Sequence, residues 1–141
     1  MGVWLKGAYI LIVHVGKDSE IEIGSLGKTF FEKGDYAYIG SAMNSLEKRI
    51  KRHKGKEKKL FWHIDYLLSA PNSELKKVFV KPSNKKEECR IAEKVSTTGI
   101  PVRGFGCSDC DCSSHLFRVK ERQLQAKLKV LGHEELRKWW K

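Results

Sequence analysis

The sequence lacks the features that mark membrane-spanning, fibrous and multidomain chains. No apolar run approaches the roughly 18 residues that a transmembrane helix needs, and the longest, residues 8–13, has the length of a strand. Only three prolines occur among 141 residues, and there is no internal repeat, Pro/Gly/Ser-rich linker or low-complexity segment. The first residues also lack the basic and apolar segments of a signal peptide. We therefore expect a globular, cytoplasmic protein with no membrane association.

Acidic residues are scarce relative to basic ones. The chain holds 28 Lys and Arg against 17 Asp and Glu, a net charge of +11, and residues 47–59 alone hold eight basic and two acidic side chains. A local basic field favours polyanions, because binding releases their condensed counterions. A nucleic acid, DNA or RNA, is such a partner, although a lysine-rich surface of a heat-adapted protein would also explain the charge. The candidate nucleic-acid-binding residues are Lys48, Lys51, Arg52, Lys54, Lys56, Lys58 and Lys59.

Hydrophobic patterning predicts an α+β fold. Segments rich in aromatic and β-branched residues predict strands, at 4–15, 21–23, 29–31, 36–40 and 75–80. Helices are expected at about 41–54, 61–70, 84–98, 121–131 and 134–140. Asn84 and Glu87 have capping-box spacing at the start of the third helix. We expect a small antiparallel sheet flanked by helices in residues 1–119, followed by a basic helical tail over 120–141.

Arg49 and His53 are the first candidates for chemistry. They are four positions apart on a predicted helix, so both side chains leave the same face. Arginine provides two parallel donors for phosphate oxygens, and histidine can accept or donate a proton near neutral pH. Solvated helices often carry such neighbours, and strand tyrosines such as Tyr9 and Tyr38 usually pack in the core. Arg49 and His53 on one helix face nevertheless suit contact with a phosphodiester.

Four blocks of sequence occur in an order that resembles the GIY-YIG nuclease family, and within it the small Uri-type branch of archaea and thermophilic bacteria. The blocks are residues 34–42, 62–68, 88–89 and 104–117. They are preceded by Gly7-Ala8-Tyr9, in which alanine stands where the family name has isoleucine. The resemblance covers about residues 5–119. The interval from Tyr9 to Tyr38 is longer than in many relatives, which implies an inserted hairpin at about 18–33.

The resemblance implies a divalent-metal-dependent endonuclease that hydrolyses phosphodiester bonds in DNA, in repair or processing, with a partner domain or protein adding specificity. It assigns Tyr9 to orient or deprotonate the attacking water, with Tyr38 in support, and Arg49 to neutralise the phosphate. Because a phenol is a poor base at pH 7, Arg49 and His53 are expected to favour its ionised form. His63, on the second predicted helix, is expected to line the cleft.

The resemblance also implies a carboxylate that binds Mg²⁺ or Mn²⁺ on the helix predicted over 84–98. Glu88 matches the Glu-Cys block of the branch and is the first choice. Glu93 is the alternative; it lies five residues on and therefore faces a different direction. Glu87 fits better as the cap partner of Asn84.

A cysteine-rich segment forms a second candidate site. Cys107, Cys110, Cys112 and His115 have the composition of a tetrahedral zinc site, with Cys89 as the alternative to Cys107 because the spacing is tight. Buried thiols, a disulfide, and a rigid loop beside the active site are competing explanations.

Two functions rival the nuclease. One is a nucleic-acid-binding module that keeps the scaffold without cutting, and the other is a structural zinc or interaction domain.

Overall fold

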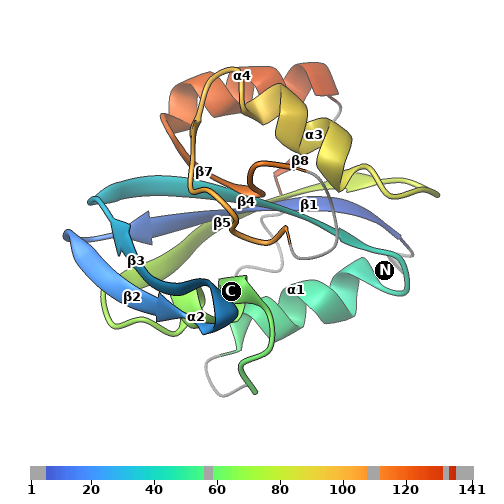
Figure 1. Cartoon of the computed structure of the whole chain (residues 1–141). Coiled ribbons are helices and arrows are strands. Elements are labelled where there is room, and N and C mark those ends of the chain that lie inside the picture. Colours follow the sequence, from blue (N-terminus) through green and yellow to red (C-terminus); the bar gives the residue numbers. More distant parts are fainter. Residues whose placement is uncertain (1–5, 56–58, 108–111, 132–133, 136–141) are drawn as a thin grey trace.

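A computed structural model describes residues 6–55, 59–107, 112–131 and 134–135. They form a sheet in the order β6-β7-β4-β1-β5-β8, a separate β2–β3 hairpin, and helices on both sides of the sheet (Figure 1). The strands are β1 (Gly7–Val15), β2 (Ser19–Ile23), β3 (Gly27–Phe31), β4 (Gly34–Ala42), β5 (Ser73–Pro82), β6 (Ile100–Pro101), β7 (Leu116–Val119) and β8 (Glu134–Glu135). The helices are α1 (Leu46–Lys54), α2 (His63–Leu68), α3 (Glu88–Val95), α4 (Glu121–Leu131) and the 3-10 turn η1 (Gly24–Leu26). The expected α+β fold is confirmed.

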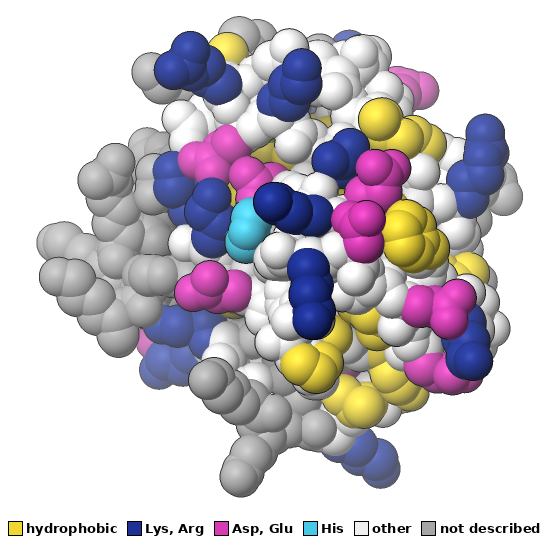
Figure 2. All heavy atoms as spheres, turned by 90° about the vertical axis from the view of Figure 1, so that its left-hand side faces the viewer, with side chains coloured by type: hydrophobic (Ala, Val, Ile, Leu, Met, Phe, Trp, Pro, Cys, Tyr) yellow, Lys and Arg dark blue, Asp and Glu magenta, His cyan; other side chains and the backbone are white. Residues whose placement is uncertain are grey.

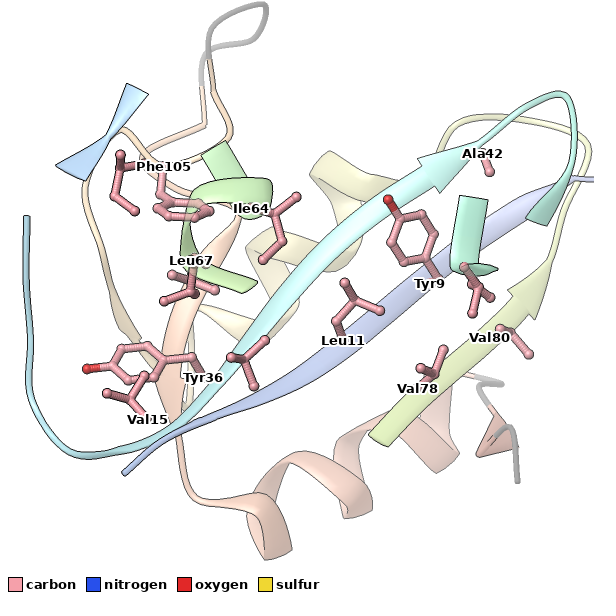
Figure 3. Close-up of a cluster of buried hydrophobic side chains, with 14 of the residues drawn as sticks. Tyr9, Leu11, Val15, Tyr36, Ala42, Ile64, Leu67, Val78, Val80 and Phe105 are labelled. Carbon is pink, nitrogen blue, oxygen red and sulfur yellow. The ribbon is translucent and has the colours of Figure 1, made fainter. Parts of the chain in front are cut away.

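The central strand β1 is buried on both faces, which explains its uninterrupted apolar sequence. It pairs antiparallel with β4 on one side and β5 on the other. Tyr9 and Leu11 face the layer of α1 and α2, where they pack with Ile64 (Figure 3). Ile10 and Ile12 face the opposite layer of α3 and α4. Burial of each large apolar side chain contributes about 1.5–3 kcal/mol, so this strand anchors both halves of the core.

The second half of β4 lies beside an opening in the sheet. Pairing between β4 and β7 covers Asp35–Tyr38. At the next residue, the Ile39 N–H donates to the His115 carbonyl oxygen at 2.9 Å, where the chain enters β7. The beginning of α3 approaches β4 at this point, and Gly40 and Ser41 border a hollow there. This break in the pairing gives side chains from both layers access to one cleft.

The β2–β3 hairpin lies in the region where an insertion is expected. Its strands pair from Ser19 with Phe31 to Ile23 with Gly27. Ile23 and Phe31 are buried in the same cluster as Tyr9, and the hairpin packs against α2. The insertion therefore extends the core on the α1 and α2 side.

Among the described residues, no helix has the length and apolar character to cross a membrane.

Two helix predictions need correction. The segment expected as a helix over 61–70 is helical at His63–Leu68, because the Asp65 carboxylate accepts the N–H groups of Phe61 and Trp62 and begins the helix later. Residues 134–135 form β8 on the edge of β5 instead of beginning a helix, and the rest of that prediction, 136–140, lies outside the described residues. In α4, Leu124 is fully buried in the same cluster as residues of α3, so the beginning of the tail belongs to the core.

Candidate active site

A cleft of about 650 Å³ lies where β1 and β4 meet α1, α2 and the first turn of α3. It gathers residues from segments that are far apart in the sequence. The chemically relevant ones are Tyr9, Tyr38, Arg49, His63, Glu88 and His115. Gly40 provides the space: a Cβ atom there would lie 2.5 Å from the Tyr9 ring. The absence of a side chain at position 40 is therefore what lets the Tyr9 ring reach the cleft.

Tyr9 is buried at the base of the cleft, and its hydroxyl lies 2.8 Å from His53 Nε2. Burial raises the pKa of Tyr9 to about 12, although the Arg49 guanidinium acts in the opposite direction. Burial likewise raises the pKa of Tyr38 well above its ordinary value. Arg49 favours the phenolate as expected, but desolvation outweighs this effect and leaves the pKa of Tyr9 above its ordinary value. Tyr9 is a neutral phenol at pH 7 with a histidine nitrogen within hydrogen-bond distance.

Tyr38 and His53 pack around the Tyr9 ring. The Tyr38 ring lies 6.4 Å from the Tyr9 ring and 6.4 Å from the His53 ring, centroid to centroid. Leu11, not Tyr9, is the direct cross-strand partner of Tyr38, so the two tyrosines contact each other diagonally. His53 is buried on α1 and lies behind Tyr9. His53 therefore meets the cleft through the Tyr9 hydroxyl.

Arg49 is held in place at the cleft wall. Its Nη1 donates to the Ser41 carbonyl oxygen at 3.1 Å, and its guanidinium carbon lies 4.5 Å from the centre of the Trp62 ring. The Arg52 guanidinium also lies over Trp62, at 4.3 Å. Arg52 is committed to Asp65 through two hydrogen bonds of 2.7 and 2.8 Å. Arg49, in contrast, lines the cleft and is positioned to meet an anion there.

Glu88 brings a carboxylate to the cleft from the first turn of α3. Its Oε1 is buried and has no hydrogen-bond partner among the described residues. Glu93 is exposed and lines a separate hollow beside Cys89 and Ser96, so the structure does not bring this alternative carboxylate into the cleft. A carboxylate oxygen that is buried and accepts no hydrogen bond can have a cation or an ordered water as its partner.

Glu87 anchors the start of α3 instead of capping it with Asn84 as predicted. Its side chain makes no capping hydrogen bond. It accepts hydrogen bonds from Lys81, Ser83 and Arg90, which hold the pKa of its carboxyl at about 2. This ionic cluster ties α3 to the end of β5. The position of Glu88, the next residue, depends on it.

His63 lines the cleft as expected, and both of its ring nitrogens have partners. Nδ1 accepts the Gly106 N–H at 2.9 Å, and Nε2 lies 3.2 Å from the Ser25 hydroxyl. Burial lowers the pKa of His63, which favours the neutral ring that these contacts require. Together the contacts join α2, η1 and the loop at 104–106. The geometry thus gives His63 a positioning role in the cleft wall.

The cysteine group that the structure brings together is Cys89, Cys112 and His115. Their ligand atoms all lie within 4.8 Å of one another, with Cys89 Sγ 3.7 Å from His115 Nε2. These three residues could hold a metal ion. Of the two sets that the sequence left open, the group corresponds to the one with Cys89 in place of Cys107, since the Cys107 thiol donates to the Phe105 carbonyl oxygen at 3.4 Å. Cys110 lies outside the described residues.

The predicted nucleic-acid-binding residues differ in their environments. Lys48, Lys51 and Lys59 are exposed, and Lys54 is half-buried. Arg52 is engaged by Asp65, so its role is structural. Lys56 and Lys58 lie outside the described residues. Figure 2 shows one face on which Lys and Arg side chains are interspersed with Asp and Glu, so the net positive charge does not form a field of one sign there.

Lys86 is a cleft residue that sequence reasoning missed. Nothing in its local pattern distinguishes it from the other lysines, since Lys85 precedes it and both are exposed. Its placement follows from the approach of the chain before α3 to the open end of β4. Together with Arg49 it adds positive charge to the lining of the cleft.

The sequence matches the profile of one protein family over residues 8–137, which includes the whole cleft and extends beyond residue 119 into α4. The family, DUF123, is described as a domain of unknown function. No curated protein and no solved structure matches the chain. The chain belongs to the DUF123 family.

Proposed function

We propose that this protein is a divalent-metal-dependent endonuclease of the GIY-YIG type that hydrolyses phosphodiester bonds in DNA. One observation carries the proposal: Tyr9, Arg49 and Glu88, from three different elements, meet in a single cleft. A phenol next to a histidine can move protons, a guanidinium binds phosphate oxygens, and an unsatisfied carboxylate oxygen can bind a cation. The basic residues of α1 would support binding of the DNA backbone through charge.

The proton path follows from the pKa of Tyr9. A phenol with a pKa of about 12 can take a proton from water only if it gives up its own. In the proposed step, the water oxygen bonds to phosphorus as the bond to the leaving ester oxygen breaks. The water proton passes to the Tyr9 oxygen, the Tyr9 proton passes to His53 Nε2, and the leaving oxygen takes a proton from solvent. Arg49 stabilises the charge that develops on the phosphate oxygens.

The residues present fit a divalent cation at Glu88. Its buried and unsatisfied Oε1 offers a hard oxygen ligand, and Mg²⁺ is commonly held by one or two carboxylates and several waters. A cation bound there supplies a Lewis acid for the phosphate and leaving oxygens. Glu87 keeps the first turn of α3 in place through its three hydrogen bonds, so Glu88 is oriented before any ligand arrives.

The proposal is tested with a cleavage panel on the purified protein. End-labelled single-stranded, duplex, nicked and flap DNA, together with RNA, are incubated with Mg²⁺, with Mn²⁺ and with EDTA. We expect strand breakage of at least one DNA form that depends on the metal. If folded protein binds DNA in a salt-sensitive manner but cleaves none of these substrates, a binding module on the same scaffold explains the cleft better. RNA cleavage without DNA cleavage would contradict the proposed substrate.

The group of Cys89, Cys112 and His115 supports a second function, as a structural zinc centre. Two thiolates and one imidazole suit Zn²⁺, which takes four ligands in structural sites. Cys89 directly follows Glu88, and His115 also lines the cleft. Zinc at this position would fix the segment 112–115 against the first turn of α3. It would thereby hold one wall of the cleft without taking part in the reaction.

Metal analysis tests the zinc centre. Protein purified without added zinc should contain about one equivalent, and Cys89→Ser and Cys112→Ser should each lose it, because removal of a ligand weakens a tetrahedral site. Cys107→Ser is the matched control, since the Cys107 thiol contacts a carbonyl oxygen outside the group. We also expect a lower midpoint of thermal unfolding in the two metal-free variants. Wild-type protein without stoichiometric zinc would contradict this function.

A further inference from the structure

Phe61 is an exposed aromatic side chain at the rim of the cleft, and neither the proton path nor the metal site uses it. It lines the cleft, and 73% of the residue is exposed. Aromatic side chains are enriched in the buried centres of binding surfaces. Phe61 lies next to Trp62, whose ring contacts it edge-on at 5.7 Å. These two rings form an aromatic ledge beside Arg49.

The backbone of the aromatic ledge and its Trp62 ring are held in place by neighbouring groups. The Asp65 carboxylate accepts the backbone N–H groups of Phe61 and Trp62 at 2.9 and 2.8 Å. The Trp62 ring is also contacted by the guanidinium groups of Arg49 and Arg52, at 4.5 and 4.3 Å. The ledge is therefore partly ordered before a flat ligand stacks on it, which lowers the entropy cost of binding.

The neighbouring charges indicate which flat ligand fits. Arg49 and Lys86 line the same cleft and attract an anion. Lys59, two residues before Phe61, is exposed. A nucleotide combines the two required groups, a phosphate for the cations and a base for the aromatic face. In a paired duplex, however, each base face is covered by its neighbours, so the base that reaches Phe61 must be unpaired.

On this basis we propose that Phe61 stacks on an unpaired base next to the scissile phosphate, and that the substrate class is DNA with a single-stranded nucleotide at the cut, such as a flap or a frayed junction. The position of this base, next to the phosphate that is cleaved, rests on the proposed nuclease function. The stacking itself does not require cleavage, so binding can be measured separately.

Binding in EDTA tests the stacking without cleavage. The probe is a flap DNA with 2-aminopurine at the first unpaired position, and a fully paired duplex is the comparison. Wild-type protein should bind the flap more tightly than the duplex and quench the 2-aminopurine fluorescence. Phe61→Ala should weaken flap binding roughly 5- to 150-fold, the range expected for loss of one stacked base. It should also abolish the quenching and leave duplex binding nearly unchanged.

Two further variants separate stacking from general effects. Phe61→Tyr retains a flat ring and should restore both flap binding and quenching. Phe30→Ala removes another exposed phenylalanine, 59% exposed on β3 and outside the cleft lining, and should behave as wild type. Equal flap binding and quenching by wild type and Phe61→Ala would overturn the inference. If Phe61→Ala loses the quenching but wild-type protein cleaves no DNA, the stacking is upheld and the nuclease function is overturned.

Discussion

Replacement of Arg49 by alanine should reduce metal-dependent DNA cleavage by about 10²–10³-fold. An arginine that neutralises developing charge in a cleft contributes on the scale of an oxyanion-hole donor. Arg49 is the side chain positioned to neutralise this charge, since Arg52 is already engaged by Asp65. The effect should lie in kcat more than in KM, because the charge on the phosphate increases in the transition state. Single-turnover cleavage of end-labelled DNA measures it.

Arg49→Lys serves as the control for this result. Lysine keeps the positive charge but not the planar fork or the contact with the Trp62 face. We expect partial activity, between those of wild type and Arg49→Ala. Circular dichroism and thermal unfolding should show that all three proteins fold. Full activity in folded Arg49→Ala would remove Arg49 from the mechanism.

Replacement of Asp65 by alanine should cost about 3–5 kcal/mol in the free energy of unfolding. The Asp65 carboxylate is fully buried and makes two hydrogen bonds to Arg52 and two to backbone N–H groups. Its removal leaves a guanidinium without its counter-ion and the start of α2 uncapped. Urea unfolding measures the change. Glu47→Gln, which removes an exposed pair with Lys51 at 3.4 Å, should change stability by less than about 0.5 kcal/mol.

The contribution of Asp65 should also depend on pH in a defined direction. Burial raises the pKa of this carboxyl, but hydrogen bonds from Arg52 and from the backbone outweigh burial and hold it below the ordinary 3.8. A group whose pKa is lowered in the folded state stabilises the protein above its unfolded pKa and loses this effect as the pH falls through the folded value. The stability difference between wild type and Asp65→Ala should therefore be constant near neutral pH and shrink below about pH 3.8. A difference that grows on acidification would contradict the ion-pair account.

Local patterns in the sequence predict those parts of the site that depend on local geometry. Strand periodicity places Tyr9 and Tyr38 on one face of neighbouring strands, and helix spacing places Arg49 and His53 on one face of α1. The contact between Tyr9 and His53, 44 residues apart, is nonlocal. So is the desolvation that raises the pKa of Tyr9. Neither can be obtained from spacing, because both depend on how α1 packs against the sheet.

The choices that spacing left open were decided by tertiary packing. Helix geometry shows that Glu88 and Glu93 face different directions, and only the approach of α3 to β4 shows which one enters the cleft. In the same way, Cys89 joins Cys112 because α3 and the loop before β7 meet in space. The late start of α2 has a local cause, the Asp65 carboxylate, that an apolar pattern does not indicate.

The most direct test of the central claim compares wild type, Glu88→Gln and Glu93→Gln on one end-labelled flap DNA, with Mg²⁺ and with EDTA. The two substitutions are chemically identical, and only Glu88 lies in the cleft. We expect wild type and Glu93→Gln to cleave at equal rates with Mg²⁺ and not with EDTA, and Glu88→Gln to lose cleavage while it still binds DNA. Equal cleavage by wild type and Glu88→Gln, or no cleavage by any of the three folded proteins, would contradict the claim.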